Sequence, residues 1–152
     1  MSALVFSFKS FEQLDNVELY EILRLRNEVF VVEQKCIFQD ADNKDQQSMH
    51  LLCKKRGELI AYCRLVLAGI SYTEMSIGRV VCKANERKSG VGTQLMTRAI
   101  ETIYAAFGKG PIKIGAQLYL QHFYEKFGFK RVSEVYWEDG IEHIEMLLHE
   151  LI

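Results

Sequence analysis

The chain lacks most of the features that would divide it or place it outside the cytoplasm. One proline occurs in 152 residues, and there is no internal repeat, low-complexity stretch or linker. The four cysteines form no Cys-x-x-Cys pair, no apolar run reaches membrane-spanning length, and the first residues lack the pattern of a secretory signal. These absences predict one cytoplasmic domain over residues 1–152, with reduced thiols and no membrane partner.

An excess of charge of either sign is also lacking. Nineteen basic and twenty acidic residues give a formal net charge of −1. Nucleic acid requires a concentrated basic face, so we expect no nucleic-acid partner. The composition, 49% hydrophobic and 26% charged, is typical of a globular protein with one substantial core.

Hydrophobic periodicity predicts a chain that alternates between strands and helices. The polar, acidic stretch 34–48 is expected to be a loop with at most a short helical turn. A mixed sheet with helices packed on it is the natural architecture for this order. We expect strands at 5–9, 50–54, 59–66, 76–82, 112–117, 129–137 and 141–148, one long helix or two at 14–32, and helices at 91–107 and 118–127.

A basic loop with two glycines joins the expected strand at 76–82 to the expected helix at 91–107. Glycine lets the backbone approach a bulky anion because it has no Cβ, and free N–H groups at a helix start attract phosphate oxygens. The loop therefore predicts an anion site, with a plain surface turn as the alternative. Its sequence is Arg87-Lys88-Ser89-Gly90-Val91-Gly92.

Two other phosphate-binding motifs do not fit this loop. A P-loop needs lysine after its second glycine, where Thr93 stands, and the dinucleotide fingerprint needs a third glycine, where Leu95 stands. The remaining Arg-x-x-Gly-x-Gly pattern, with Tyr-x-x-x-Gly-Phe at 124–129, resembles the GNAT superfamily of acetyl-CoA-dependent N-acetyltransferases. The resemblance spans essentially the whole chain. It implies an α+β fold with a central mixed, mostly antiparallel sheet flanked by helices.

The resemblance also implies a cofactor and the residues that hold it. In that family the loop amides hold the cofactor pyrophosphate, and the preceding strand binds the pantetheine through its backbone. Acetyl-CoA is therefore the expected acetyl donor, and Gln117 stands where the family usually has asparagine. The implied cofactor-binding residues are Val80, Val81, Cys82, Arg87, Lys88, Ser89, Gly90, Val91, Gly92, Thr93 and Gln117.

Shorter strings are similar to the ElaA branch of the superfamily. The branch does not define the acceptor, which we expect to be a small-molecule or peptide amine. Exposed sheet edges often pair in such folds, so a homodimer is one arrangement to test. The strings lie at 30–34, 40–42, 115–117, 123–124 and 138–143, together with His50.

Acetyl transfer to an amine needs a neutral amine, a polarised carbonyl and a proton for the departing thiolate. Tyr124 matches the family position for the last role, and a phenol with an ordinary pKa near 10 is protonated at neutral pH. An aromatic packed beside its neighbours is the plain alternative. A backbone N–H near Val81 or Cys82 is the candidate for polarising the carbonyl, and Cys82 itself is expected to be a strand thiol rather than a nucleophile.

The general base stays open among Glu33, His50, Glu142, His143 and a water relay. A hydrogen-bonded structural role fits His143 as well as a catalytic one. Glu33 fits either the substrate entrance or a solvated helix end. No residue type or spacing decides between these readings.

No metal-binding pattern is complete. An EF-type loop built on the aspartates at 40, 42 and 45 would need glycine at position 45 and glutamate at position 51, and His50 with Cys53 lacks a second pair for zinc. We expect the acidic cluster to shape a loop or to attract a cationic amine. The function expected is acetyl-CoA-dependent N-acetyltransfer by direct attack in a ternary complex, with a non-catalytic acyl-CoA-binding module as the alternative.

Overall fold

Two antiparallel sheets frame the structure, a computed structural model that describes residues 3–149. The first has the order β1-β2-β3-β4, and the second has the order β5-β8-β6 with β7 also paired to β8. A parallel bridge between Met75 and Ile112 joins them, so the predicted mixed, mostly antiparallel arrangement is confirmed but divided into two sheets. The strands are β1 Leu4–Ser10, β2 Met49–Lys55, β3 Glu58–Val66, β4 Ser76–Cys82, β5 Ile112–Gln117, β6 Lys130–Arg131, β7 Tyr136–Glu138 and β8 Ile141–Leu148.

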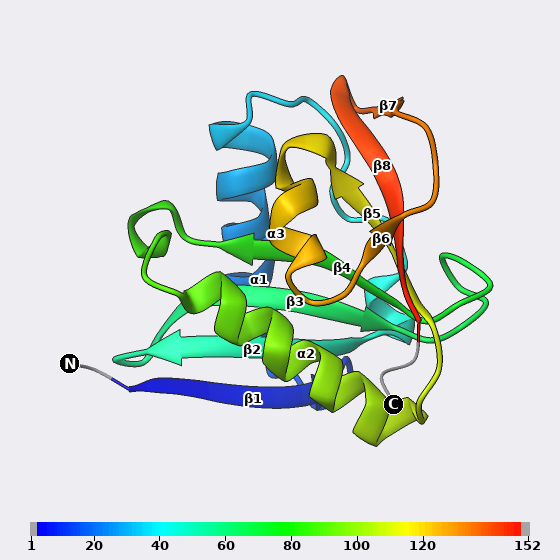
Figure 1. The fold of residues 1–152 in the computed structure, drawn as a ribbon. Helices are drawn as coiled ribbons and strands as arrows, with labels where there is room; N and C mark the ends of the chain where they lie inside the picture. Colours follow the sequence, from blue (N-terminus) through cyan, green and yellow to red (C-terminus); the bar gives the residue numbers. More distant parts are fainter. Residues whose placement is uncertain (1–2, 150–152) are drawn as a thin grey trace.

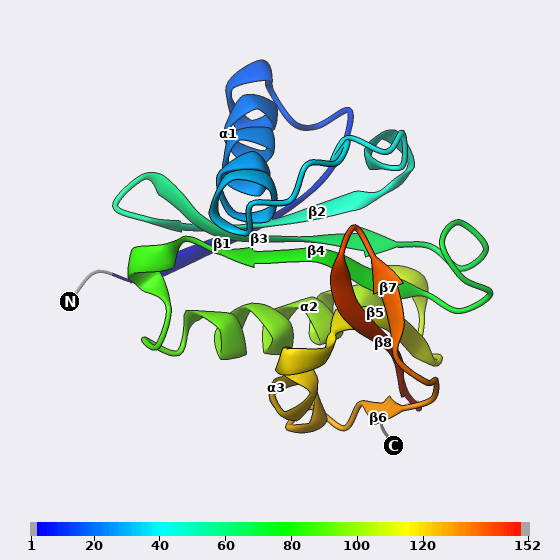
Figure 2. The same cartoon turned by 90° about the horizontal axis from the view of Figure 1, so that it is seen from above.

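Helices cover both faces of the first sheet. Helix α1 (Asn16–Arg26) lies on one face and α2 (Val91–Phe107) on the other, while α3 (Gln121–Glu125) lies on the α2 side next to the second sheet (Figures 1 and 2). Within residues 3–149, no helix combines the length and the apolar character needed to cross a membrane.

Helix α1 begins where Asp15 and Glu18 form a capping box. The Asp15 carboxylate accepts the Glu18 N–H at 2.7 Å, and the Glu18 carboxylate accepts the Asp15 N–H at 3.0 Å. The helix continues into a π-helix, η1 (Asn27–Glu33). The predicted helical stretch at 14–32 is therefore two joined helices, and the second has the geometry that is frequent at functional sites.

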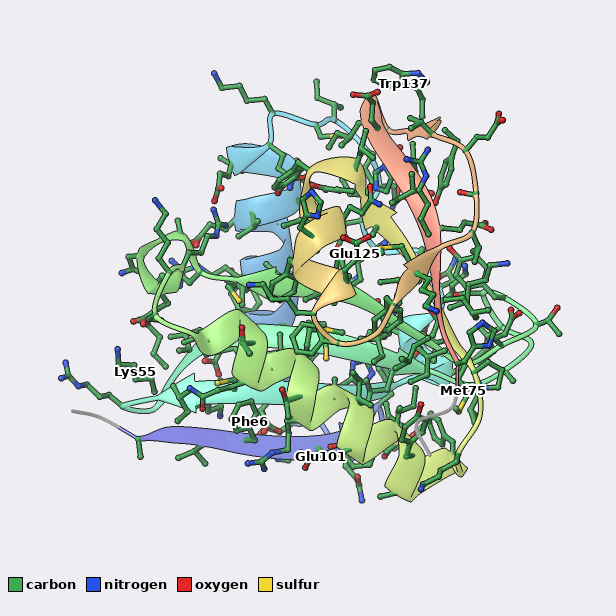
Figure 3. All side chains as sticks on the ribbon, viewed as in Figure 1. Phe6, Lys55, Met75, Glu101, Glu125 and Trp137 are labelled. Atoms are coloured by element: carbon green, nitrogen blue, oxygen red, sulfur yellow. The ribbon has the colours of Figure 1, made fainter. Side chains whose placement is uncertain are left out.

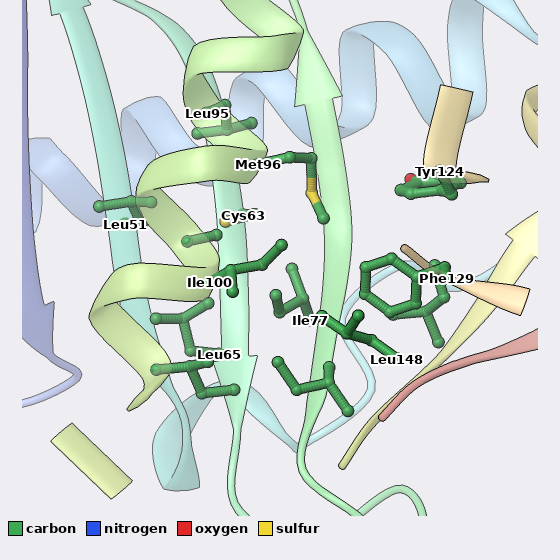
Figure 4. Packing of buried hydrophobic residues seen from close by; sticks show 14 of the residues in the cluster. Leu51, Cys63, Leu65, Ile77, Leu95, Met96, Ile100, Tyr124, Phe129 and Leu148 are labelled. Carbon is green, nitrogen blue, oxygen red and sulfur yellow. The ribbon is translucent and has the colours of Figure 1, made fainter. Parts of the chain in front are cut away.

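Helix α2 follows the predicted bounds and buries the predicted apolar stripe. Leu95, Met96 and Ile100 lie over the first sheet, where Figure 4 shows them beside Cys63 and Ile77. Each such side chain contributes about 1.5–3 kcal/mol when fully buried. Because α2 is packed along its length, its N-terminus is held at a fixed place beside β4.

The strand predicted at 129–137 is wrong in its middle. The structure forms only β6 and β7, and residues 132–135 between them belong to no strand, although the Val132 N–H still donates to the Glu145 carbonyl at 2.9 Å. Here the hydroxyl of Ser133 accepts the N–H of Glu145 at 2.8 Å and replaces a backbone partner. The hairpin predicted around 138–140 is confirmed, because Asp139 and Gly140 have φ of +51° and +77° between β7 and β8. Trp137 projects outward from β7 and is 69% exposed (Figure 3).

Candidate active site

A cavity of about 570 Å³ lies between β4 and β5, where the bridge at Met75 no longer holds the two sheets together. Residues 77–82 of β4 form one wall, and Ile114, Gly115 and Gln117 of β5 form the other. The remaining walls come from η1, the loop after it, the start of α2, α3 and the β7–β8 turn. The cavity therefore gathers segments that are far apart in the sequence.

Strand β4 is irregular beside this cavity. Its pairing with β3 shifts register between Tyr62 and Arg64, and Arg79 has a φ of +49°, which is uncommon for a residue with a Cβ. Such a bulge takes backbone groups out of the ladder and redirects them. Val80, Val81 and Cys82, the strand residues implied to bind the cofactor, all line the cavity.

The start of α2 forms one end of the cavity and has the geometry expected of an anion-binding end. Gly90 is the N-cap residue with a φ of +88°, and no side chain caps the first turn. The first backbone N–H that bonds back into the helix is that of Gln94, which donates to the Gly90 carbonyl at 3.1 Å, so the earlier N–H groups are available to a ligand. Lys88, Gly90, Gly92 and Thr93 line the cavity.

Two residues of the predicted loop set do not line the cavity. The Ser89 hydroxyl donates to the Glu86 carbonyl, which folds the loop back on itself. The Val91 side chain is buried in the core under α2. For these two residues, only the backbone is placed to contribute to an anion site.

Arg87 is paired across the cavity with Glu33 of η1. Nη2 of Arg87 lies 2.9 Å from Oε1 of Glu33, Nη1 bonds the other carboxylate oxygen, and the guanidinium also donates to the Cys82 carbonyl. The hydrogen bond from Arg87 lowers the pKa of Glu33. Glu33 is therefore ionised at neutral pH, and its depressed pKa makes it a weak candidate for the general base.

Tyr124 lies in the cavity wall, from α3. Its ring is 6% exposed and packs edge-on against Phe123, with ring centroids 5.1 Å apart. It also packs edge-on against Phe129, with centroids 6.1 Å apart (Figure 4). Burial raises the pKa of the Tyr124 phenol, so it stays protonated across the physiological range. Tyr124 is thus packed among aromatic neighbours, as the plain alternative expects, and it also lines the cavity.

Cys82 also lines the cavity, and burial raises the pKa of its thiol. The thiolate form needed for nucleophilic attack is therefore disfavoured. Across the cavity, the side-chain amide of Gln117 is paired with that of Gln34, with N–O distances of 3.3 and 3.4 Å.

Among the base candidates, position separates His143 from His50 and Glu142. His50 is buried on the α1 face, where its ring bonds the Tyr62 hydroxyl at 2.6 Å and the Asp45 carbonyl at 2.9 Å, and it does not line the cavity. Burial also lowers its pKa. Glu142 is exposed on β8 and does not line the cavity. His143 does line it.

Sequence reasoning missed Glu138 as a partner of His143. Its carboxylate lies 3.6 Å from Nε2 of His143, while Nδ1 lies 2.8 Å from the Ile141 carbonyl. In the sequence, Glu138 reads only as a turn residue. The β7–β8 hairpin register, which sets Glu138 opposite Ile141, is the signal that brings it near the histidine.

The acidic cluster of the 34–48 loop forms an ion-pair network and is not an open anionic patch. Its charges are matched one for one, so it shapes the loop, and the expected attraction for a cationic amine is not supported. Burial by itself raises the pKa of Asp42, but hydrogen bonds and charge from Arg64 outweigh it and hold that pKa well below its ordinary value. The network consists of Arg26, Arg64, Arg79, Asp40, Asp42 and Asp45, with ion-pair distances of 2.7–3.3 Å.

A cavity between diverging strands that ends at an uncapped helix N-terminus suits an extended ligand that carries an anionic group such as phosphate. Residues 16–150 match the family model described as acetyltransferase (GNAT) domain, and the chain belongs to this family.

The relatives place the chain within the family. A UPF0039 protein of Schizosaccharomyces pombe is 43% identical over 150 residues, which cover 97% of this chain and 99% of the relative. Protein ElaA of Escherichia coli is 43% identical over 136 residues, 88% of this chain and 89% of the relative. The predicted resemblance to the GNAT superfamily and its ElaA-like branch is confirmed.

Two solved structures confirm the predicted fold. The crystal structure of E. coli ElaA has a TM-score of 0.91 at 39% identity and covers 97% of this chain and 100% of that chain. An acyl-CoA N-acyltransferase from Pseudomonas aeruginosa has a TM-score of 0.91 at 40% identity, over 96% of this chain and 99% of that chain. These similarities support N-acyltransfer from an acyl-CoA as the general activity of the family.

Proposed function

We propose that the protein transfers an acetyl group from acetyl-CoA to a primary amine by direct attack in a ternary complex. The observation that carries the proposal is one cavity that runs from the uncapped start of α2 to Tyr124 and His143. A cofactor held at the helix start and an acceptor at the histidine would share this space. The family supports an acyl-CoA donor, and the acetyl group and the amine are the proposed specifics.

The start of α2 fits the diphosphate of CoA. Gly90 has open space around it, since a Cβ there would meet no heavy atom within 4 Å. Available N–H groups and the positive end of a 17-residue helix favour an anion at this point. Lys88 adds a positive charge to the same wall. When bound, CoA supplies the acetyl thioester, whose carbonyl a redirected N–H of β4 is suited to polarise.

His143 is the base that the geometry favours. Its Nδ1 faces the Ile141 carbonyl, which can only accept, so Nδ1 carries the proton and Nε2 is left as the acceptor. Nε2 takes a proton from the acceptor ammonium, and the neutral amine then attacks. The Glu138 carboxylate, 3.6 Å away, stabilises the resulting imidazolium.

Tyr124 is the proposed acid. The carbon–sulfur bond breaks as the new carbon–nitrogen bond forms, and the sulfur needs a proton. The buried phenol holds its proton until that moment and donates it to the thiolate. After the attack the nitrogen loses its second proton to solvent water, the Tyr124 phenolate regains a proton from solvent, and the His143 imidazolium releases its proton. One proton is released overall, and the active site returns to its starting state.

A CoA-release assay tests this proposal. Purified protein and acetyl-CoA are mixed with polyamines, amino acids, aminoglycosides and peptides, and a thiol reagent reports free CoA. We expect at least one amine to give turnover. We expect Tyr124→Phe to lower kcat by at least tenfold while the Kd for acetyl-CoA stays within about twofold, since the phenol acts only on the leaving group.

Tyr20→Phe is the matched control, because Tyr20 lies exposed on α1 and does not line the cavity. Turnover of Tyr124→Phe at the wild-type rate would exclude Tyr124 as the acid. Tight binding of acetyl-CoA with no release of free CoA in the presence of any amine would favour the alternative, a non-catalytic acyl-CoA-binding module. Sedimentation of the purified wild-type protein tests whether it forms the proposed homodimer. Fractionation of cells tests the proposed cytoplasmic location.

A further inference from the structure

The segment 33–36, at the end of η1, contacts three separate walls of the cavity. Glu33 pairs with Arg87 beside the anion-binding end, and the Gln34 side chain pairs with Gln117 of β5. Cys36 donates its S–H to the Asp139 carbonyl in the β7–β8 turn. This segment therefore touches both the cofactor end and the acceptor side of the proposed site.

The Arg87 guanidinium lies where a diphosphate would meet it. Arg87 is three residues before Gly90, at the loop that presents the available N–H groups of α2. Two of its nitrogens point at the Glu33 carboxylate, which is an anion with the same forked geometry that phosphate offers to arginine. Glu33 thus occupies the guanidinium face in the manner expected of a phosphate.

Little free energy is needed to separate Arg87 from Glu33. The side chains of Arg87 and Glu33 are 38% and 40% exposed, and an ion pair exposed to this degree contributes little to stability. A diphosphate carries more charge than one carboxylate and gains the helix N-terminus as well. The competition for Arg87 therefore favours the cofactor.

Resting on the proposed function, we propose that the CoA diphosphate displaces Glu33 from Arg87, and that the freed Glu33 carboxylate then binds the ammonium group of a cationic acceptor. Glu33 lines the same cavity as Glu138 and His143, so a carboxylate released from Arg87 stays within the space that the acceptor would enter. Binding is then ordered, with the cofactor first. The Glu33 contact for the acceptor does not exist until the cofactor is in place.

The first test follows the Glu33 carboxylate by NMR. Protein with ¹³C-labelled glutamate is titrated with acid in the absence and presence of saturating CoA, and the Glu33→Gln variant assigns the resonance. We expect the pKa of Glu33 to lie below its ordinary value in the free protein and to rise toward it with CoA bound. An unchanged pKa at saturation would overturn the displacement.

Calorimetry with CoA supplies an independent measurement. Glu33→Gln removes the competitor for Arg87, so CoA should bind about two- to fivefold more tightly, the change expected from a pair of this exposure. Glu86→Gln is the matched control, since it removes the same charge from the adjoining loop while Glu86 pairs with Lys55. An equal increase in CoA affinity in the two variants would mean that only the loss of a negative charge matters, and it would contradict the displacement. In an Arg87→Gln background, Glu33→Gln should give no gain.

The acceptor half is tested with butylamine as a minimal primary ammonium. In labelled protein saturated with CoA, butylamine should shift the Glu33 carboxylate resonance, and without CoA it should not. A shift of equal size without CoA, or no shift in either state, would overturn the acceptor contact. If calorimetry detects no CoA binding at all, the proposed function fails, and that result is distinct from CoA binding with Glu33 unaffected.

Discussion

Replacing Gly90 by aspartate and by asparagine separates charge from backbone shape at the anion site. Gly90 has a φ of +88° and open space where a Cβ would lie. Asparagine enters the left-handed region more readily than most residues, and aspartate has the same shape with one negative charge. Both variants should lose about 1 kcal/mol of folding stability, because each bears a Cβ in this conformation.

The difference in CoA affinity between the two variants isolates the repulsion. An aspartate about 5 Å from the nearest phosphate, with an effective dielectric between about 20 and 80, opposes each phosphate charge by about 1–3 kcal/mol. The Kd of Gly90→Asp should therefore exceed that of Gly90→Asn by roughly 5- to 150-fold. The side-chain oxygens of aspartate and asparagine can both accept N–H groups of the first turn, so that competition is common to the two variants and does not enter their difference.

Isothermal calorimetry with CoA at low salt measures this difference, and thermal unfolding checks that both variants are folded. When the experiment is repeated in about 0.5 M NaCl, charge screening should reduce the difference in Kd between the two variants. Equal affinities of the aspartate and asparagine variants at low salt would refute the placement of the diphosphate at the start of α2.

Three further predictions concern the base and the buried ion pairs. His143→Gln should lower kcat/KM by about 100-fold or more at neutral pH, with a loss that shrinks as rising pH deprotonates the amine; a pH–rate profile checks this, and a constant loss would contradict it. Asp45→Asn leaves two buried arginines short of a partner and should cost about 3–5 kcal/mol in urea unfolding, whereas the exposed Glu125→Gln should cost under about 0.5 kcal/mol. The pKa values of Asp42 and Asp45 are lowered in the folded state from 3.8. The contribution of these carboxylates to the free energy of unfolding should therefore be fully present above about pH 5 and be lost progressively as the pH falls. A free energy of unfolding that stays constant from about pH 5 to 2.5 would contradict this.

Local patterns predicted most of the fold because the elements concerned are determined by their own residues. The four-residue stripe of α2 and the Gly108 that ends it were readable without knowledge of the fold. The loop from Arg87 to Gly92 was also readable, because a glycine with positive φ and neighbouring basic residues can be recognised in the local sequence. The strand at 129–137 failed because Ser133 supplies a side-chain acceptor from 12 residues away, which no periodicity records.

The site was less predictable where its residues depend on tertiary pairing. Glu138 becomes a partner of His143 only through the β7–β8 register, and His50 leaves the site because its strand turns it toward the α1 face. The bulge at Arg79 depends on its register with β3. A charged residue at the end of a helix is usually exposed to solvent. Arg26 is instead fully buried against two aspartates.

Amide NMR with acetyl-CoA checks the proposed placement of the cofactor at the start of α2. In ¹⁵N-labelled protein, we expect the largest shifts at the N–H groups of Val91, Gly92 and Thr93, at the uncapped start of α2. Smaller shifts should follow along β4 from Val80 to Cys82. Saturable binding that leaves the first turn of α2 unshifted, or no binding at millimolar acetyl-CoA, would contradict it.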